Sequence, residues 1–565
     1  MSRTPFVAAL AAALAIVLPA CGSSSGGAPA TVANAAVAEM EPNDTSLTAT
    51  SLAFGQFGEG NVDIMGDEDY WSFDATAGQL ISIELFAVRF DQVTWATNGT
   101  IATLVLYDTD GVTRLFTHEY SSNFADGWTN GYDEEHDFDI PCIELPATGT
   151  YYVRVTQDDQ LVNGGAYALH VKAHDGPAIT YREMEPIMVS GSNDAFGTAE
   201  AITPGRIKGF HVDDENDYYS FTIAEPTVVR FTLTAHRNGV WRSDDAYYDP
   251  AMTLYDTDGT TALRINDDVY YYDSALITRL AAAGTYYVAV GECCGDGDSV
   301  YFLDFEVIEG TEVAEVEPND TFMQAQAIPY DTTIVATKTA ANEDWYAIDG
   351  VAGDAVWIWY LPEDLNTAGI PVVFAPDGTT QMPQAYGQGF GVLRVQFQET
   401  ATHYLRIIQS LDFAYALRVE RVFQSAFESE ANDTSGTADS FDGAKRASGR
   451  IDVMGDVDFY SFDAEGGTGV VVSVICSKGS GFGQLDEFGS NADVTVTIRD
   501  AMGNAIASSG TDNPSASDPD AFGIADGLPS LAVCFVPPTT GTYFVEIAEE
   551  DGNTGVDHLY FVSVR

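Results

Sequence analysis

A short acidic motif recurs along the chain and offers the strongest candidate for chemistry. It reads Glu-Met-Glu-Pro-Asn-Asp at residues 39–44, Glu-Val-Glu-Pro-Asn-Asp at 315–320 and Glu-Ser-Glu-Ala-Asn-Asp at 428–433. A broken copy begins with Glu-Met-Glu-Pro at residues 183–186 and resumes with Asn-Asp at residues 193–194. Self-similarity at a long spacing indicates that one module is used four times.

An extended backbone places every second side chain of this motif on one face. In the first copy Glu39, Glu41 and Asn43 should therefore point the same way, and Asn43-Asp44 suits a turn. Carboxylates and an amide oxygen crowded in this way repel one another unless a cation lies among them. Because Ca²⁺ takes about six to eight oxygen ligands in flexible geometry, the motif predicts a calcium site. The alternative is an exposed acidic linker that opens each domain.

A second acidic motif follows each copy, directly before an aromatic residue. Its central aspartates are Asp69, Asp217, Asp344 and Asp458, which lie 30, 34, 29 and 30 residues after the first glutamate of their copy. The longer second spacing is accounted for by an insertion at residues 187–192. An acidic linker alone does not require a fixed spacing, so the two motifs of each copy are expected to act together.

Each copy then continues with the same series of predicted strands. An alternating strand such as residues 80–85 comes first, followed by Asp-Thr-Asp-Gly turns such as 108–111 and Gly-Thr-Tyr-Tyr-Val strands such as 149–153. Asp-Gly after a β-rich run is a strong hairpin signal. Short aromatic and β-branched strands with little helical periodicity predict an all-β protein built of antiparallel β-sandwiches.

The chain has 565 residues, too many for a single core, and the repeats divide it. Short linkers between the repeats predict a stiff string of domains. The expected segments are a signal peptide at 1–20, a flexible tether at 21–38, and four tandem domains at 39–176, 183–309, 315–422 (divergent) and 428–565.

The order of these motifs resembles the bacterial pre-peptidase C-terminal domain and the related collagen-binding domains of clostridial collagenases. The resemblance covers nearly all of the chain after Glu39. It implies four tandem jelly-roll-like antiparallel β-sandwiches, each with a calcium site. Family members usually sit behind a secreted peptidase or other hydrolase, and none is attached here.

The resemblance also implies the calcium ligands of each copy. In the second copy the insertion displaces Asn193 and Asp194 from the pattern. The implied ligands are Glu39, Glu41, Asn43, Asp44, Asp67 and Asp69 in the first copy; Glu183, Glu185, Glu215 and Asp217 in the second; Glu315, Glu317, Asn319, Asp320, Asn342 and Asp344 in the third; and Glu428, Glu430, Asn432, Asp433, Asp456 and Asp458 in the fourth.

The N-terminus resembles the signal of a bacterial lipoprotein. Arg3 precedes an apolar run at residues 6–18, which is followed by Pro-Ala-Cys ending at Cys21. In such signals the cysteine is acylated, so Cys21 is expected to attach the protein to outer-membrane lipid. We expect a cell-surface or outer-membrane lipoprotein, and the alternative is a plain secreted protein.

The remaining cysteines fit an oxidising compartment. Cys476 and Cys534 both lie in strand-like runs of the fourth repeat, so a disulfide between them is a prediction. Cys293 and Cys294 are adjacent and could bond to each other or pair elsewhere. Cys142 has no partner in its repeat and is expected to be a buried thiol.

Charge and missing motifs limit the function. The chain has 24 Lys and Arg against 85 Asp and Glu, a formal net charge of -61, which disfavours nucleic acid as a partner. It contains no G-x-S-x-G, H-E-x-x-H or P-loop sequence. We therefore expect a protein that is not an enzyme.

Binding is the better functional hypothesis. Aromatic runs occur in the middle of three repeats, and exposed aromatic residues suit a flat polymer surface; the alternative is that these residues belong to the cores. The sequence thus predicts a calcium-stabilised β-sandwich array for extracellular binding or adhesion to a polysaccharide or protein polymer. The alternative function is a secreted hydrolase or an accessory subunit of one. The runs lie at residues 120–139, at Trp241, Tyr247, Tyr248 and Tyr270–Tyr272, and at 357–360.

Overall fold

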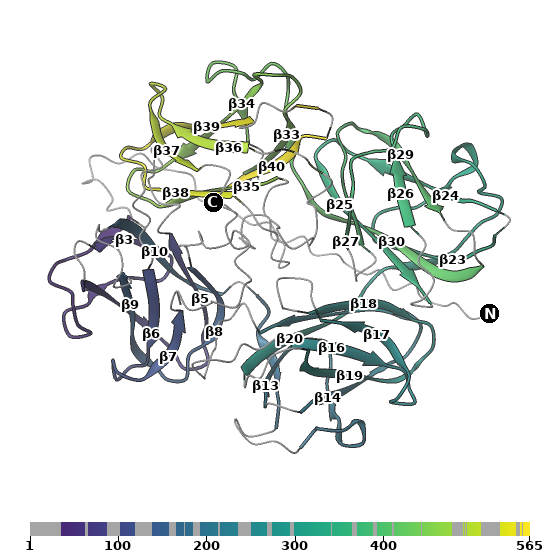
Figure 1. Cartoon of the computed structure of the whole chain (residues 1–565), viewed down its shortest axis with the longest axis horizontal. Coiled ribbons are helices and arrows are strands. Elements are labelled where there is room, and N and C mark those ends of the chain that lie inside the picture. The colour runs from purple at the N-terminus through teal and green to yellow at the C-terminus, as the bar shows by residue number, and fades with distance from the viewer. Residues whose placement is uncertain are drawn as a thin grey trace, which may run out of the picture. The chain divides into compact units, whose positions relative to one another are not determined.

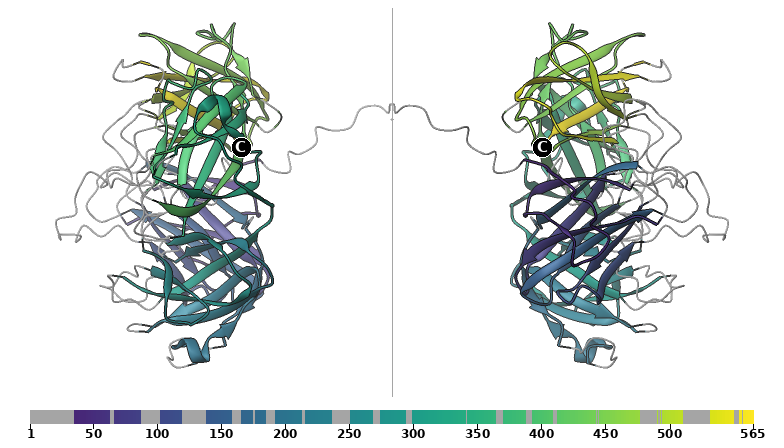
Figure 2. Two further views of the ribbon diagram at one scale, coloured as in Figure 1. Left: turned by 90° about the vertical axis from the view of Figure 1, so that its right-hand side faces the viewer. Right: turned by 90° about the vertical axis from the view of Figure 1, so that its left-hand side faces the viewer.

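The described part of the chain is almost entirely β-structure. Its only helical segments are single 3₁₀ turns such as η1 (Phe196–Thr198) and η3 (Phe322–Gln324), and the two side views in Figure 2 show strands throughout. The predicted all-β class is confirmed. The computed structural model describes residues 35–565 apart from 63–65, 87–101, 119–137, 158–164, 175, 185–191, 213–214, 236–249, 268–273, 294–298, 341, 364–369, 388–391, 409–411, 442, 444, 477–489, 491, 493, 510–530, 550–553 and 556.

The described strands form eight sheets, which we group by sequence into sheet pairs 1 to 4 (Figure 1). Sheet pair 1 joins β1 (Val37–Ala38), β3 (Gln56–Val62), β10 (Gly165–Ala173), β5 (Leu80–Phe86) and β8 (Phe138–Glu144) in one sheet, and β2 (Thr50–Ser51), β4 (Glu68–Ala75), β9 (Gly149–Gln157), β6 (Ala102–Tyr107) and β7 (Arg114–His118) in the other.

Sheet pair 2 repeats this strand order. Its first sheet is β11 (Ile179–Arg182), β13 (Gly205–His211), β20 (Ser299–Ile308), β15 (Thr227–Thr234) and β18 (Ala275–Leu280). Its second sheet is β12 (Glu200–Ala201), β14 (Asp217–Ile223), β19 (Gly284–Glu292), β16 (Pro250–Tyr255) and β17 (Ala262–Asn266).

Sheet pair 4 follows the same plan, and sheet pair 3 is a variant of it with six strands in its first sheet and four in its second. The sheets of pair 3 are β21 (Thr311–Ala314), β23 (Thr332–Lys338), β30 (Phe413–Gln424), β25 (Asp354–Pro362), β28 (Val392–Gln396) and β27 (Ala385–Gly387), and β22 (Gln326–Ala327), β24 (Asp344–Gly350), β29 (Ala401–Ile408) and β26 (Ile370–Phe374). Those of pair 4 are β31 (Ala426–Phe427), β33 (Arg446–Arg450), β40 (Leu559–Val564), β35 (Val470–Ile475) and β38 (Leu531–Phe535), and β32 (Asp439–Ser440), β34 (Val457–Ala464), β39 (Gly541–Glu549), β36 (Val494–Arg499) and β37 (Ala505–Ser509).

The pairing rule is also shared. The short first strand of each sheet runs parallel to its neighbour, as β1 does to β3 and β2 to β4, and the strands that follow pair antiparallel, as β3 with β10 and β4 with β9. Each acidic motif begins just after the parallel strand β1, β11, β21 or β31. The topology therefore holds the motif against the second strand of the sheet.

Each sheet pair has its own apolar core, made by the alternate residues of its strands. In sheet pair 1, Trp71 and Tyr167 are fully buried, and the Trp71 Nε1–H donates to the Tyr167 hydroxyl at 2.8 Å. A Cβ on Gly60 would lie 2.2 Å from the Tyr167 ring, so only glycine leaves room for this tyrosine. Gly209 plays the same part beside Tyr301.

Residues 34–565 form one compact unit, and apolar contacts also join the sheet pairs. Trp357 and Trp359 on β25 are 7% and 3% exposed and share a buried cluster with Val228 of sheet pair 2 and Phe561 of sheet pair 4. The run at 357–360 is therefore buried, which confirms for this run the alternative that the aromatic residues belong to the core. It offers no polymer-binding surface. The other aromatic runs lie mostly outside the described residues.

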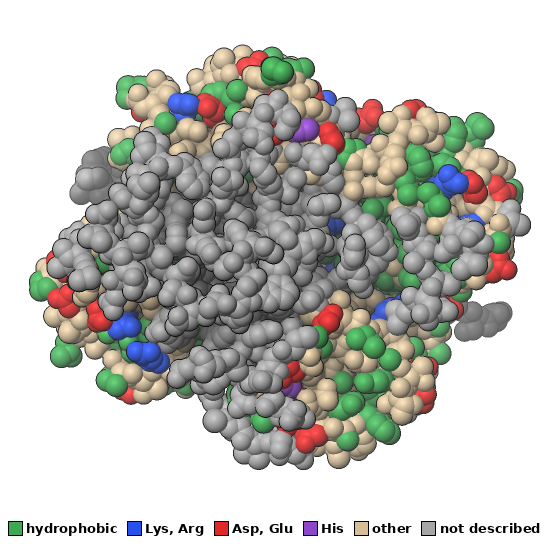
Figure 3. Space-filling view, in the orientation of Figure 1, with side chains coloured by type: hydrophobic (Ala, Val, Ile, Leu, Met, Phe, Trp, Pro, Cys, Tyr) green, Lys and Arg blue, Asp and Glu red, His purple; other side chains and the backbone are tan. Residues whose placement is uncertain are grey.

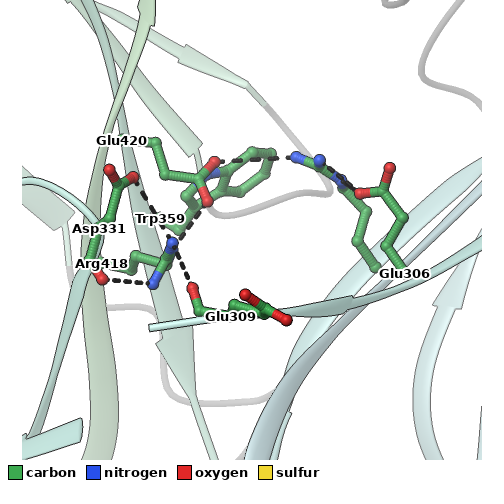
Figure 4. A network of polar contacts seen from close by, with 7 residues as sticks. Glu306, Glu309, Asp331, Trp359, Arg418 and Glu420 are labelled. Carbon is green, nitrogen blue, oxygen red and sulfur yellow. Dashed lines mark hydrogen bonds and ion pairs between the residues drawn. The ribbon is translucent and has the colours of Figure 1, made fainter. Parts of the chain in front are cut away.

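Polar contacts accompany this apolar cluster (Figure 4). The Glu420 carboxylate accepts from Trp359 Nε1 at 2.8 Å and from Arg418 Nε at 2.7 Å. Arg230 of sheet pair 2 lies 3.7 Å from Glu420 and 2.6 Å from Glu306. Sheet pairs 2 and 3 are thus joined by charges as well as by apolar area.

The first and last sheet pairs are in contact through Glu84 on β5. Its carboxylate lies 2.8 Å from His170 Nδ1, 3.0 Å from Lys172 Nζ and 2.8 Å from Arg565 Nη2 of the last residue. Burial alone would raise the pKa of Glu84, but the charges of Arg565 and Lys172 and the bond with His170 outweigh it and hold the pKa well below its usual range. The expectation of a simple string of domains is wrong at this contact.

Glu84→Ala is expected to lower the free energy of unfolding at pH 7 by about 3–5 kcal/mol, because the partly buried charges of Arg565 and Lys172 would lose their buried carboxylate. Denaturant unfolding measures the loss. The matched control is Glu306→Ala, which breaks an exposed pair with Arg230 and should cost less than about 1 kcal/mol. Equal losses in the two variants would contradict a special role for Glu84.

The predicted bond between Cys476 and Cys534 is wrong, because both side chains are thiols. Cys534 pairs with Val471 across β35 and β38, five residues from Cys476, and five residues of strand span about 16 Å. A disulfide needs Cα atoms within about 7 Å.

Cys142 is a buried thiol, as expected. Cys293 is disulfide-bonded, and Cys294 lies outside the described residues.

Candidate metal centres

Three groups of carboxylates converge in the described residues. Within each group the side chains offer oxygens that all lie within 4.8 Å of one another. The first glutamate of each group is partly buried, the second is exposed and the aspartate is buried. The groups are Glu39, Glu41 and Asp69 in sheet pair 1; Glu315, Glu317 and Asp344 in sheet pair 3; and Glu428, Glu430 and Asp458 in sheet pair 4.

The first glutamate of each motif is fixed by backbone bonds to the second strand of its sheet. The Glu39 N–H donates to Glu59 O at 2.9 Å, and the Glu39 carboxylate accepts from the Asn61 N–H at 2.7 Å. The other copies repeat both bonds. Glu183 bonds Lys208 O and Phe210 N, Glu315 bonds Val335 O and Thr337 N, and Glu428 bonds Ser448 O and Arg450 N.

The asparagine of each motif links it to the second acidic motif. Asn43 is fully buried, and its backbone oxygen accepts from the Tyr70 N–H at 3.0 Å, directly after Asp69. The two motifs therefore meet, as their fixed spacing suggests. The equivalent bonds join Asn193 to Tyr218, Asn319 to Trp345 and Asn432 to Phe459.

A buried tyrosine orients each aspartate, a feature that the sequence reasoning missed. The Tyr167 hydroxyl on β10 donates to Asp69 Oδ2 at 2.8 Å. Each such tyrosine lies near the start of the last strand of its repeat, which is the signal that could have found it. The equivalent bonds run from Tyr301 to Asp217, from Tyr415 to Asp344 and from Tyr560 to Asp458.

A second buried group holds the tyrosine hydroxyl in turn. Trp71 does so in sheet pair 1. In sheet pairs 2, 3 and 4 a tyrosine takes that place, and its hydroxyl contacts both the orienting tyrosine and the first glutamate. The Tyr346 hydroxyl lies 2.6 Å from the Tyr415 hydroxyl and 2.8 Å from the Glu315 carboxylate. The carboxylates thus rest on a rigid buried layer, which is suited to a preorganised ion site.

The same two buried oxygens lack a hydrogen-bond donor in every sheet pair. They are the Oδ1 atom of the motif asparagine and the Oδ1 atom of the aspartate, on side chains that are 0% exposed. Leaving such atoms unpaired costs about 1–3 kcal/mol each, and carboxylate and amide oxygens are what Ca²⁺ prefers. The donor set therefore fits calcium. Among the described residues these oxygens are Asn43 and Asp69, Asn193 and Asp217, Asn319 and Asp344, and Asn432 and Asp458.

Burial and crowding also act on the carboxyl pKa values. Burial raises the pKa of Asp69 to about 8, and the charges of Glu39, Asp67 and Glu41 add to this effect while the Tyr167 bond opposes it. The same causes raise the pKa of Asp217 to about 9 and of Asp458 to about 7. Negative charge is unfavourable at these positions unless a cation compensates it.

Other predicted ligands lie at the edge of these groups. Asp44 is exposed and lies outside its group, and Asp194, Asp320 and Asp433 are likewise exposed. Three more predicted ligands hold the preceding turn: Glu215 accepts from Val212 N, Asn342 from Thr339 N and Asp456 from Asp452 N. Asp67 is buried beside Glu39. Glu185 lies outside the described residues.

Residues 67–157 match the family model of the bacterial pre-peptidase C-terminal domain. This segment contains Asp67 and Asp69 and runs from β4 to β9. The remainder of sheet pair 1 and sheet pairs 2 to 4 lie outside the match.

Solved structures also resemble parts of the chain. The pre-peptidase C-terminal domain of a collagenase from Bacillus anthracis is 18% identical, covering 22% of this chain and 94% of that one, with a TM-score of 0.15. Tandem CBM51 modules of a family 98 glycoside hydrolase from Streptococcus pneumoniae are 8% identical, covering 43% and 82%, with a TM-score of 0.14. A search of curated proteins gives no match.

In the described residues, no helix has the length and apolar character needed to span a membrane.

Proposed function

We propose that the protein is a non-catalytic, calcium-stabilised array of four jelly-roll-like β-sandwiches of the pre-peptidase C-terminal type. The family match in sheet pair 1, the same strand order in sheet pairs 2 and 4 and its variant in sheet pair 3 support four copies, with the boundaries 39–176, 183–309, 315–422 and 428–565. The array binds an extracellular polysaccharide or protein polymer. Cys21, acylated as in lipoproteins, attaches it to the cell surface.

The single observation that carries the calcium proposal is the repeated pair of buried oxygens without donors. A structural carboxylate is normally satisfied by hydrogen bonds, and Asp69 Oδ2 is satisfied by Tyr167. Its Oδ1 atom and that of Asn43 are left over beside Glu39 and Glu41. A bound calcium ion would supply the compensating charge. The chain's own part is to hold the oxygens in place through the tyrosines and the backbone N–H groups.

The acidic side chains on one face of the molecule do not gather into a single patch. On the face shown in Figure 3, the described Asp and Glu side chains are scattered among polar and apolar ones. The acidic excess of the chain then favours solubility, while the buried carboxylates have the specific task of holding calcium.

Thermal unfolding of the full chain with excess calcium and then with chelator tests the proposal. At a free calcium concentration 100 times the Kd, each site should add about 2.7 kcal/mol to the stability of its sheet pair. We expect a clear rise in Tm that is largely lost in Glu41→Ala with Glu430→Ala, two exposed residues whose removal leaves the cores intact. The control Glu306→Ala should keep the full rise. Identical curves with calcium and with chelator would refute the proposal.

A further inference from the structure

The third cluster differs from the others at one buried position. In each sheet pair, a backbone N–H of the second strand donates to the first glutamate; the donors are Asn61, Phe210, Thr337 and Arg450. The residue after each donor is therefore equivalent across the repeats. These residues are Val62, His211, Lys338 and Ile451, all 0% or 1% exposed.

In the first and fourth copies this position is apolar. Val62 and Ile451 belong to the cores of their sheet pairs. In the third copy Lys338 brings an ammonium group instead, and its Nζ donates to the backbone oxygens of Thr339 (2.9 Å) and Asn342. A lysine buried to 1% exposure is costly unless negative charge lies nearby.

That negative charge comes from the third acidic cluster. Lys338 Nζ donates to the backbone oxygen of Asn342, two residues before Asp344, so the ammonium group lies close to the segment that carries this carboxylate. The ammonium is thus electrostatically linked to the carboxylate that the Tyr415 hydroxyl orients. Lys338 therefore offsets part of the negative charge of the cluster.

A second substitution affects the same cluster. Where the other copies carry Asp67, Glu215 and Asp456, the third carries Asn342, an amide without charge. Its Nδ2–H donates to the Glu317 carboxylate, so a protein group already satisfies an oxygen that a cation would need. The first cluster has four carboxylates, from Glu39, Glu41, Asp67 and Asp69, and the third has three carboxylates beside an ammonium group.

We propose that the third cluster is self-neutralised: the Lys338 ammonium and the Asn342 amide take over the role of the divalent cation, so sheet pair 3 is stable without calcium and binds it at least ten times more weakly than sheet pairs 1 and 4. This inference rests on the proposed calcium function. Its physical reason is that a divalent ion would have to approach a buried positive charge and displace an amide hydrogen bond.

Equilibrium dialysis of the full chain with calcium, followed by metal analysis, tests this inference. The free calcium is set just above the level that fills the tightest sites. Glu41→Ala and Glu430→Ala should each lose one bound ion per chain, whereas Glu317→Ala should lose none. All three glutamates are exposed, so the substitutions leave the cores unchanged. Loss of one ion in Glu317→Ala would overturn the inference.

A gain-of-binding variant provides the converse test. Lys338→Ile with Asn342→Asp copies the fourth cluster, with Ile451 and Asp456, into the third. It should bind one more calcium ion per chain than the parent, and an unchanged count in the folded variant would contradict the inference. If the variant does not fold, the Glu317→Ala count decides alone. A parent chain that binds no calcium at all would instead refute the proposed function.

Discussion

Replacing Asp69 and Asp458 with asparagine is expected to change thermal stability in opposite directions with and without calcium. Both carboxyls are buried beside other carboxylates, and burial raises the pKa of Asp69 to about 8 and of Asp458 to about 7. At pH 9 in chelator the parent therefore bears unfavourable buried charge, which asparagine removes. We expect the Tm of the double variant to be several degrees higher in chelator and several degrees lower in calcium than that of the parent.

The control keeps the same strands and chemistry but uses exposed positions. Asp74 on β4 and Asp463 on β34 accept from Thr150 and Thr542 at the surface. Asp74→Asn with Asp463→Asn should shift the Tm slightly and equally in both buffers. If Asp69→Asn with Asp458→Asn lowers the Tm in both buffers, these carboxylates act as ordinary structural groups rather than as ion ligands.

Stability without calcium is expected to fall as the pH rises from 5 to 9. Burial raises the folded-state pKa of Asp69 to about 8 and of Asp217 and Glu428 to about 9. In this window the folded chain binds more protons than the unfolded chain, so the free energy of unfolding decreases with pH and the loss is complete above the folded pKa. Since one unit of pKa shift corresponds to about 1.4 kcal/mol, we expect a drop in Tm of at least several degrees.

Calcium should reverse this trend, because the ligands bind the ion only when deprotonated. Melting curves at half-unit pH steps in chelator and in excess calcium measure both slopes. Carboxyl groups with lowered pKa values do not interfere above pH 5: Glu84 contributes stability that is lost only as the pH falls through its low folded pKa. Burial lowers the pKa of His403, which opposes the trend mainly below about pH 6.5, the ordinary pKa of histidine. A chelator curve that is flat or that rises between pH 5 and 9 would contradict the burial of charge in these clusters.

Much of the candidate site follows from local sequence rules. The repeated motif correctly brings Glu39 and Glu41 together. Residues 39–49 form no strand and the Glu41–Pro42 peptide bond is cis, so alternation in an extended segment does not explain the positions of Asn43 and Asp44. The fixed spacing to Asp69 correctly indicates that two distant motifs meet. These features could be predicted because they depend on backbone geometry and on one repeated strand order.

Other features depend on contacts between segments far apart in the sequence. The tyrosines that orient the aspartates come from the last strand of each repeat, and their partnership with Asp69 or Asp458 requires the sheet order. Trp357 and Trp359 are covered by other sheet pairs, which no pattern within one repeat can reveal. Cys534 lies on β38 and Cys476 directly follows the neighbouring strand β35, but Cys534 is opposite Val471 rather than Cys476. The pairing register of two strands cannot be deduced from a run of valines.

The central claim, that the acidic motifs hold calcium, is tested most directly by anomalous diffraction from crystals of the protein grown with calcium. We expect strong anomalous peaks among the carboxylates of Glu39, Glu41 and Asp69 and among those of Glu428, Glu430 and Asp458, within about 2.3–2.6 Å of their oxygens. Crystals that show only water at both positions under saturating calcium would contradict it.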